Sequence, residues 1–579
     1  MKKIKDFISG INNSSVRSLI ILLIILLSCF SCNEDKFLEE TPLDFASPEN
    51  SYVTYDDFLS AVYNLHYLTR YTFWHDDNPY WWYGTDLVES YLDIDGSNDY
   101  SVYWGTTGGG PIWLWTESYQ IIYDANVIIN RSESDNSELS DSEKALIQAE
   151  ARFFRGYFYK CLANIFGGVP LVLEEIETPR RDYVRATREQ VYEQCVEDLK
   201  FAAENLPDID EVTDESRINK LAANHVLAEV YVSLGNWQDA ITEASKVIDH
   251  SATALITERF GDSDEKLFND PDFDGDVYWD LFRNGNQDRS AGNTESLWVL
   301  QFYYNEGDRN GDLGGGGRVD YTLSRMVAPD LTKAYILQSN GSSSGILKQA
   351  NTYYNHRGQG YHRPSSYFLY RLFGSQDLRN SKCNVIRDYP VLNPNNEYNG
   401  KWLVADNLPL IVNNITDTAR FCFPTIGKVV TPGKDPDEYI DKSSDVEGSL
   451  LYDARRVWRK HYQIRLAETY LLRAEAYLGA GNTTMAAQDI NVVRRRSEAP
   501  DVSAGDVDID YILDERLREL YYEELRVLTL GRLSKIVDRT RRLNPVIGAT
   551  VEDHQNLWAI PNSEIIKNTE GDLEQNPGY

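Results

Sequence analysis

Aromatic side chains gather in two short segments of the sequence, one at 73–82 and the other at 98–104. Both segments also carry amide or carboxylate groups. Rigid rings offer flat apolar faces at a small entropic cost, and neighbouring polar groups can bind hydroxyls, so this combination suits a sugar. The candidate ligand-contacting residues of these segments are Trp74, Trp81, Trp82, Asn98, Tyr100, Tyr103 and Trp104. The alternative is that these rings pack inside the protein.

Further aromatic candidates lie much later in the chain. Tyr303 and Tyr304 follow Phe302, and Tyr361 precedes a histidine and an arginine. An alternative for 301–303 is a strand whose side chains point inward and outward in turn. Trp113 and Trp115 stand at the start of a helical pattern, so we expect them in the core.

One segment resembles the beginning of a calcium-binding loop. Asp308, Asn310 and Asp312 have the spacing of the first ligands, but Leu313 stands where the loop needs glycine and Val319 where it needs glutamate. We therefore expect no metal or other cofactor, and a structural calcium ion is the weaker alternative.

Catalysis is a separate hypothesis, because glycoside hydrolysis needs two carboxylates about 5–9.5 Å apart. The chain has 90 acidic residues, so chance pairs carry no information. The acidic residues of the repeating helices are expected to form ion pairs with nearby arginines. These residues are Glu468, Glu475, Glu515 and Glu523, and the arginines are Arg465, Arg494, Arg516 and Arg526. Neither a Ser-His-Asp motif nor an HExxH motif occurs, and we predict that the protein is not an enzyme.

The elements that must position the aromatic segments are helix pairs. Residues 219–248 and 465–494 each indicate two helices joined at a glycine, with small and large residues at the same spacings of 3, 4, 5 and 4. Small residues let two helices approach closely, as in a tetratricopeptide repeat. The two sets are Ala228, Tyr231, Gly235, Ala240 and Ala244, and Ala474, Tyr477, Gly481, Ala486 and Ile490.

Two more helix pairs are expected if an insert is allowed between the two helices of each pair. One joins 149–164 to 188–205, and the other joins 55–70 to 116–132. The sequence therefore predicts an all-α, tetratricopeptide-like helical superhelix with four helix-pair units and long loop-rich inserts. Such inserts on a rigid frame commonly carry binding residues.

The N-terminus resembles a lipoprotein signal peptide. Basic residues precede a short apolar run, 19–27, that is shorter than the roughly 20 residues needed to span a bilayer. Two cysteines follow, and we expect lipidation of Cys32, with Cys29 as the alternative. The net charge of −33 would repel nucleic acid, so the predicted membrane contact is the lipid anchor.

The other four cysteines are too few for a disulfide scaffold at this length. Cys161 and Cys195 lie in helical patterns and are expected to be small buried residues. Cys383 and Cys422 could pair, and the sequence leaves this open.

Several short motifs, in a fixed order, resemble the SusD/RagB outer-membrane lipoproteins of Bacteroidetes. The most diagnostic is RLAETYL at 465–471, followed by AEA at 474–476. The other segments are FLEETP at 37–42, SPEN at 47–50, EARFFRGYFY at 150–159, FGGVPL at 166–171 and QNPGY at 575–579. The resemblance runs over the whole mature chain.

The resemblance implies a division of the chain into four regions. These are a signal peptide at 1–31, an N-terminal helical region at 32–250 with an aromatic insert at 71–115, a loop-rich variable ligand-binding region at 251–455, and a C-terminal region at 456–579. In the family, loop aromatics and an asparagine between the first two helices hold the glycan, and 98–104 occupies that place.

The same resemblance implies a function at the cell surface. A lipid-anchored outer-membrane protein would capture an oligosaccharide or polysaccharide and deliver it to a SusC-like TonB-dependent transporter. A peptide-binding member of the same family is an alternative, and a surface glycoside hydrolase is a weaker one.

Overall fold

The computed structural model describes residues 51–74, 81–89, 99–262, 264–304, 323–354, 356–414, 417–452, 454 and 457–579. Residues 54–579 form one compact unit. Cys29, Cys32, Asn98 and the calcium-like segment at Asp308 lie outside the described residues. Within those ranges, no helix is long and apolar enough to span a bilayer, and no group of three or more His, Cys, Asp or Glu side chains could hold a metal ion.

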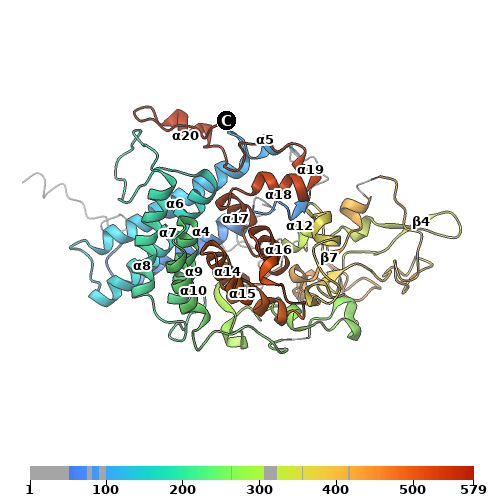
Figure 1. Cartoon of the computed structure of the whole chain (residues 1–579). Helices are drawn as coiled ribbons and strands as arrows, with labels where there is room; N and C mark the ends of the chain where they lie inside the picture. Colours follow the sequence, from blue (N-terminus) through green and yellow to red (C-terminus); the bar gives the residue numbers. More distant parts are fainter. Residues whose placement is uncertain are drawn as a thin grey trace, which may run out of the picture. The chain divides into compact units, whose positions relative to one another are not determined.

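Four helix pairs form the frame, as the sequence predicts (Figure 1). Successive pairs pack side by side, and the fourth packs against the third although the long insert separates them in sequence. The pairs are α4 (Tyr55–Trp74) with α6 (Gly109–Ser132), α7 (Asp141–Phe166) with α8 (Arg188–Asn205), α9 (Lys220–Leu234) with α10 (Trp237–Ile248), and α14 (Leu466–Gly479) with α15 (Thr483–Arg496). The all-α, tetratricopeptide-like fold class is confirmed.

Small residues at the predicted positions explain the close packing. Ala228, Ala244, Ala474 and Ala486 are fully buried between helices. Gly235 ends α9 at φ +75°, a left-handed conformation that a residue with a Cβ adopts only at a cost. The helix starts are fixed as well, because α7 and α8 each begin with a reciprocal capping box.

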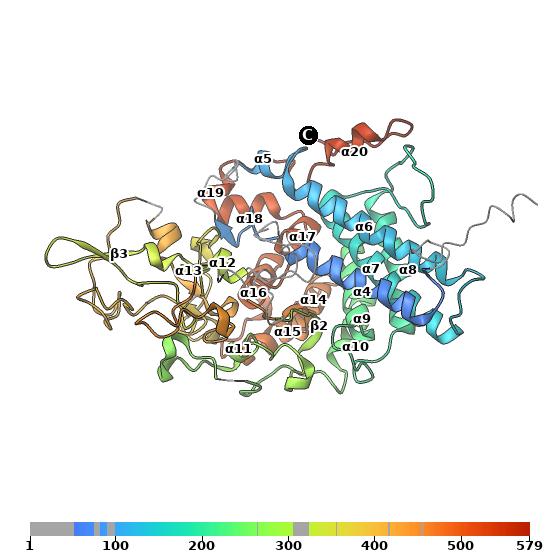
Figure 2. The same cartoon turned by 180° about the vertical axis from the view of Figure 1, so that it is seen from behind.

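Short antiparallel strand pairs tie the inserts together. They are β1 (Val88–Glu89) with β5 (Arg363–Pro364), β2 (Ser296–Leu300) with β8 (His461–Arg465), β3 (Tyr335–Leu337) with β4 (Ser343–Gly345), and β6 (Val385–Ile386) with β7 (Thr425–Ile426). The β2–β8 pair joins residues 296–300 of the long insert to residues 461–465, which follow it. This pairing closes the insert beside α14 (Figure 2).

The remaining helices are short and belong to the inserts or the C-terminal region. In the inserts these are α5 (Tyr100–Tyr103), α11 (Val277–Asp280), α12 (Leu323–Val327) and α13 (Ser366–Tyr370). In the C-terminal region they are α16 (Ile509–Leu520), α17 (Arg526–Arg532), α18 (Ile536–Leu543), α19 (Pro545–Gly548) and α20 (Asn562–Lys567).

The predicted ion pairs of the C-terminal helices form in the core. Glu468 pairs with Arg516 at 2.6 Å, Glu515 with Arg494 at 2.7 Å, and Glu523 with Arg465 at 2.6 Å. Glu475 pairs at 2.7 Å with Arg532, which is not among the predicted arginines. Arg526 pairs with Asp86 and Glu524, neither of which is among the predicted acidic partners.

The four described cysteines all carry free thiols. Cys161 and Cys195 are fully buried, as predicted. Cys383 and Cys422 do not form the disulfide that the sequence left open.

Candidate functional site

A buried carboxylate fixes the first aromatic insert to the C-terminal helices. Asp86 accepts hydrogen bonds from Arg526 Nε at 2.9 Å, Arg526 Nη2 at 2.7 Å and Arg539 Nε at 2.6 Å. Burial alone would raise the pKa of Asp86, but the two guanidiniums hold it well below its usual range. The carboxylate is therefore charged at neutral pH. It fastens loop 81–89 to α17 and α18.

The same loop is joined to the long insert. Strand β1 pairs with β5, and the Ser365 amide donates to the Leu87 carbonyl at 2.6 Å. The Ser365 hydroxyl donates to the Asp86 carbonyl at 2.7 Å, and Arg363 pairs with Glu89 at 2.9 Å. Two inserts that are far apart in sequence thus meet on one rigid support.

A row of aromatic rings crosses this junction. Tyr103 packs edge-on against Tyr83 with ring centroids 5.0 Å apart, and Tyr83 packs against His362 at 5.7 Å. His362 lies beside Tyr361 at 6.5 Å, and the Arg420 guanidinium covers the Tyr361 ring at 5.3 Å. We call Tyr83, Tyr103, Tyr361, His362 and Arg420 the Tyr103–Tyr361 surface. Except for the buried Tyr83, its members are partly exposed.

Polar groups on this surface are suited to hydroxyl recognition. The Tyr361 hydroxyl donates to Gln359 Oε1 at 3.1 Å, and the Arg420 Nε donates to the Gln359 carbonyl at 2.9 Å. Burial lowers the pKa of His362 to about 3, so its imidazole is neutral at pH 7. The Nδ1 of His362 is buried, so a sugar hydroxyl could bond only to Nε2, which donates or accepts according to the tautomer.

Five predicted contact residues are packed inside the protein, and for them the structure favours the packing alternative. Trp81 donates its indole N–H to the Phe73 carbonyl at 2.9 Å, and Trp82 donates to the Glu524 carbonyl at 2.8 Å. A buried ring cannot stack on a ligand. The five are Trp74, Trp81, Trp82, Tyr100 and Trp104, each 7% exposed or less.

Trp104 shows why the sequence was misleading. Its ring stacks on Trp558 with centroids 4.4 Å apart and an interplanar angle of 12°. A Cβ added to Gly110 would lie 1.9 Å from the Trp104 ring, and one added to Gly84 would lie 2.5 Å from its Nε1. The glycine-rich segment closes around this ring, so the nearby glycines were a sign of packing.

Of the two tryptophans at the start of α6, Trp115 lies in the core as expected, whereas Trp113 is only partly buried. Trp115 is 5% exposed, and the partly buried Trp113 donates its indole N–H to the Thr72 carbonyl at 2.8 Å.

The other two predicted tyrosines lie after β2. Tyr303 is 66% exposed, its hydroxyl donates to Gln301 at 3.0 Å, and Lys460 lies 5.0 Å from its ring centre. Tyr304 packs edge-on against Trp458 at 4.6 Å and donates its hydroxyl to Glu438. Because β2 ends at Leu300, the alternative strand over 301–303 does not form.

Sequence reasoning missed Tyr83, Arg420 and the polar role of His362. Tyr83 directly follows the candidates Trp81 and Trp82, and the local sequence does not indicate which of these rings lies at the junction. Arg420 enters from residues 417–421, where no motif marks it.

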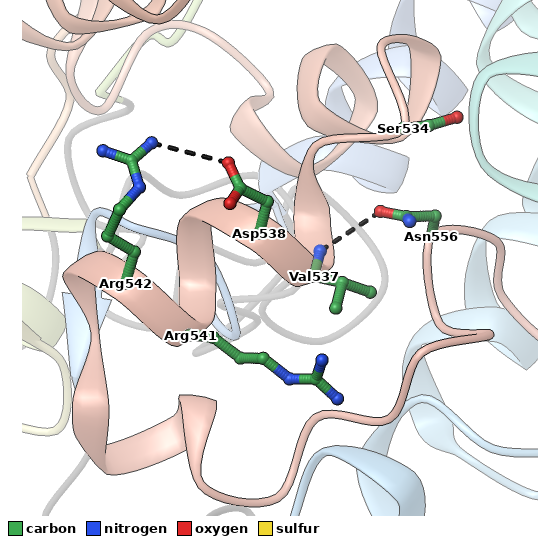
Figure 3. Close-up of a pocket in the computed structure, with 6 residues that line it drawn as sticks. All are labelled: Ser534, Val537, Asp538, Arg541, Arg542 and Asn556. Carbon is green, nitrogen blue, oxygen red and sulfur yellow. Dashed lines mark hydrogen bonds and ion pairs between the residues drawn. The ribbon is translucent and has the colours of Figure 1, made fainter.

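A hollow of about 460 Å³ on α18 offers a contrasting surface (Figure 3). Arg541 and Arg542 point apart there, and both have carboxylate partners. Arg541 pairs with Asp553 at 2.6 Å, and Arg542 pairs with Asp510 at 2.9 Å and Asp538 at 3.5 Å. Because both guanidiniums are already paired with carboxylates, this hollow is poorly suited to bind an anionic ligand.

Comparison with known families identifies both ends of the chain. A family model described as starch-binding associating with outer membrane matches residues 36–232. The SusD family model matches residues 439–579. Together the two matches cover more than half of the chain.

Comparison with curated proteins finds relatives of similar length. A SusD-like protein of Formosa agariphila is 24% identical over 575 residues, covering 95% of this chain and 94% of its own. A SusD-like protein of Bacteroides ovatus is 28% identical over 203 residues, or 32% of each chain.

Solved structures share the fold over nearly the whole chain. A laminarin binding SusD-like protein superposes with a TM-score of 0.64 at 20% identity, covering 91% of this chain and all of its own. Surface glycan-binding protein A from Bacteroides thetaiotaomicron, in complex with laminarihexaose, gives 0.64 at 17% identity, covering 90% of this chain and all of its own.

Proposed function

The chain belongs to the SusD/RagB family. From this premise we propose that it is a cell-surface glycan-binding lipoprotein that captures an oligosaccharide for import. The observation that carries the proposal is the Tyr103–Tyr361 surface, where partly exposed rings and hydrogen-bonding groups meet on a rigid junction of two inserts. Sugar C–H faces would stack on Tyr103 and Tyr361, and hydroxyls would bond to the polar groups beside them.

Rigid support matters for affinity. A ring that is already fixed loses little entropy when a ligand docks on it, and the Asp86 ion pairs supply that fixation. The two structural neighbours named for laminarin and laminarihexaose make a β-glucan a reasonable first ligand to test.

The test is binding of the purified protein to a panel of oligosaccharides by affinity electrophoresis and calorimetry. Tyr103→Ala and Tyr361→Ala should weaken binding of the recognised glycan about tenfold or more, because a stacked ring contributes on the order of 1–2 kcal/mol. Tyr123→Ala is the control, since Tyr123 is a 39% exposed tyrosine on α6. Unchanged affinity in both site variants would remove this surface from the proposal, and binding of peptides alone would favour the peptide-binding alternative.

The proposed role is binding without catalysis. Glu515, Glu519, Glu523 and Glu524 of the C-terminal region are buried and held by arginines, as Glu519 is by Arg465 at 2.6 Å. Carboxylates engaged in this way cannot flank a glycosidic bond. Incubation of the pure protein with a bound glycan should give no products, and steady product release would contradict the proposal.

The proposal includes a lipid anchor and a transporter partner. The anchor at Cys32, or alternatively Cys29, would hold the protein at the outer membrane beside a SusC-like TonB-dependent transporter. Labelled fatty acid should be lost from Cys32→Ser and retained by Cys29→Ser, and the reverse would assign Cys29. Copurification of a transporter with the tagged protein from native membranes tests the partner, and its repeated absence would contradict it.

A further inference from the structure

A cavity of about 480 Å³ lies in the long insert, next to the Tyr103–Tyr361 surface. Its volume falls within the roughly 300–1,000 Å³ of small-molecule sites. Four segments line it, 329–335, 347–350, 356–359 and 450–452. We call it the Arg357 pocket. Gln359 belongs to its wall and also accepts the Tyr361 hydroxyl at 3.1 Å, so the pocket and the surface adjoin.

Arg357 on the wall of this pocket has no carboxylate partner among the described residues. Its guanidinium lies 4.0 Å from the centre of the Tyr452 ring and donates to the Tyr452 carbonyl. Arg357 is partly exposed, whereas fully buried arginines are matched by acids, as Arg283 is by Glu265 at 2.9 Å and Arg379 by Glu515 at 2.8 Å. Arg357 thus keeps N–H donors for a group that enters the pocket.

Two more nitrogen groups line the same pocket. Lys333 is exposed and forms no ion pair with any described residue. His356 is 3% exposed, its Nδ1 lies 2.6 Å from Asp435 Oδ1, and its Nε2 has no hydrogen-bond partner in the described part of the chain. His356 also has φ +55°, a left-handed conformation that is held at a cost and often marks functional positions.

The charge on the wall is unusual for this protein. The whole chain carries a net charge of −33, yet Arg357 and Lys333 face one acidic wall residue, Asp330. Asp330 already accepts a hydrogen bond from the Thr332 hydroxyl at 2.5 Å. Lys348 is not counted, because it pairs with Asp445. Tyr335, which is 41% exposed, adds a ring on which a sugar could stack.

We propose that the Arg357 pocket binds an anionic substituent, a carboxylate or a sulfate ester, on the glycan held by the Tyr103–Tyr361 surface. This proposal rests on the proposed glycan-binding function and specifies its ligand as an acidic polysaccharide. The guanidinium of Arg357 forms charged hydrogen bonds to the anion, Lys333 adds a second positive charge at the rim, and Tyr335 packs against the sugar ring.

The experiment compares three probes by calorimetry: laminarihexaose, an oligogalacturonate and a sulfated galactan oligosaccharide. The wild-type protein should bind at least one acidic probe more tightly than the neutral one, and its affinity should fall as salt rises. Arg357→Gln should lower that affinity about tenfold or more, the effect of losing a charged hydrogen bond. Lys333→Gln should lower it less, and Lys567→Gln, a 70% exposed lysine on α20, should leave it unchanged.

The outcomes separate the two proposals. The acidic-ligand inference is overturned if the protein prefers neither acidic probe, or if Arg357→Gln keeps full affinity for the acidic probes. Glycan binding itself still stands in that case, provided that the protein binds the neutral probe and Tyr361→Ala weakens this binding. Failure of all glycans to bind overturns both. The carboxylate and sulfate probes identify which anion is recognised. If Arg357→Gln does not fold, as judged by its melting curve, Lys333→Gln decides the question from the exposed rim.

Discussion

Replacing Asp86 with asparagine should loosen the junction that carries the proposed binding surface. The carboxylate accepts three hydrogen bonds of 2.6–2.9 Å from Arg526 and Arg539 in a fully buried position. Each charged hydrogen bond contributes about 1.5–3 kcal/mol, but the values do not add.

The loss of stability in Asp86→Asn depends on which ion pairs Arg526 and Arg539 retain. Arg526 retains Glu524 at 3.0 Å, and Arg539 retains Asp510 at 2.9 Å. The loss should therefore be that of removing one member of a buried ion pair, about 3–5 kcal/mol of the free energy of unfolding. Because this carboxylate holds loop 81–89, which carries Tyr83 of the Tyr103–Tyr361 surface, glycan affinity should fall as well.

The assay is urea unfolding followed by circular dichroism and tryptophan fluorescence, with limited proteolysis to report opening of loop 81–89. Asp553→Asn is the control, since Asp553 forms an exposed ion pair with Arg541 and should matter little. If the free energy of unfolding of Asp86→Asn lay within about 1 kcal/mol of the wild-type value and its proteolysis were unchanged, the Asp86 ion pairs would not hold this junction.

Other predictions concern the core. Trp104→Ala should cost about 3–5 kcal/mol by removing a ring stacked on Trp558, and a stable variant that had lost only glycan binding would contradict its placement in the core. Thiol labelling of the unreduced, denatured protein should modify all four cysteines of residues 54–579, and protected thiols would indicate a disulfide. Burial lowers the pKa of His225 from 6.5 to about 3. The stability that the neutral, buried imidazole contributes is therefore complete above pH 6.5, and below that pH it falls by ~1.4 kcal/mol for each pH unit. His225→Gln should therefore flatten the fall in urea midpoint between pH 7 and 5, and an equal fall in both proteins would argue against this.

The sequence predicted the helical frame well because helix pairing is a local property. Ala228 and Ala244, like Ala474 and Ala486, lie within single helix pairs, so their spacing reports the packing directly. The division of the long chain at 250 and 455 stays a prediction, since residues 54–579 form one compact unit.

The site was harder to predict because its parts come from distant segments. Composition marked Trp82 and Trp104 as rings that could stack on a ligand, but only the fold shows that Trp82 bonds to the Glu524 carbonyl and that Trp104 stacks on Trp558. Likewise, no local pattern connects Asp86 with Arg526 and Arg539. The pairing of Glu515 with Arg494 was predictable, because the two residues lie in neighbouring helices, whereas its pairing with Arg379 joins it to a distant segment.

The most direct test of glycan capture at the Tyr103–Tyr361 surface is a calorimetric comparison of Tyr361→Phe with Tyr361→Ala, using the tightest glycan found for the wild-type protein. Phenylalanine keeps the ring and loses only the hydrogen bond to Gln359. We expect Tyr361→Phe to bind within a fewfold of wild type and Tyr361→Ala to bind about tenfold or more weakly. Wild-type affinity in Tyr361→Ala, with the fold intact, would contradict glycan capture at this surface.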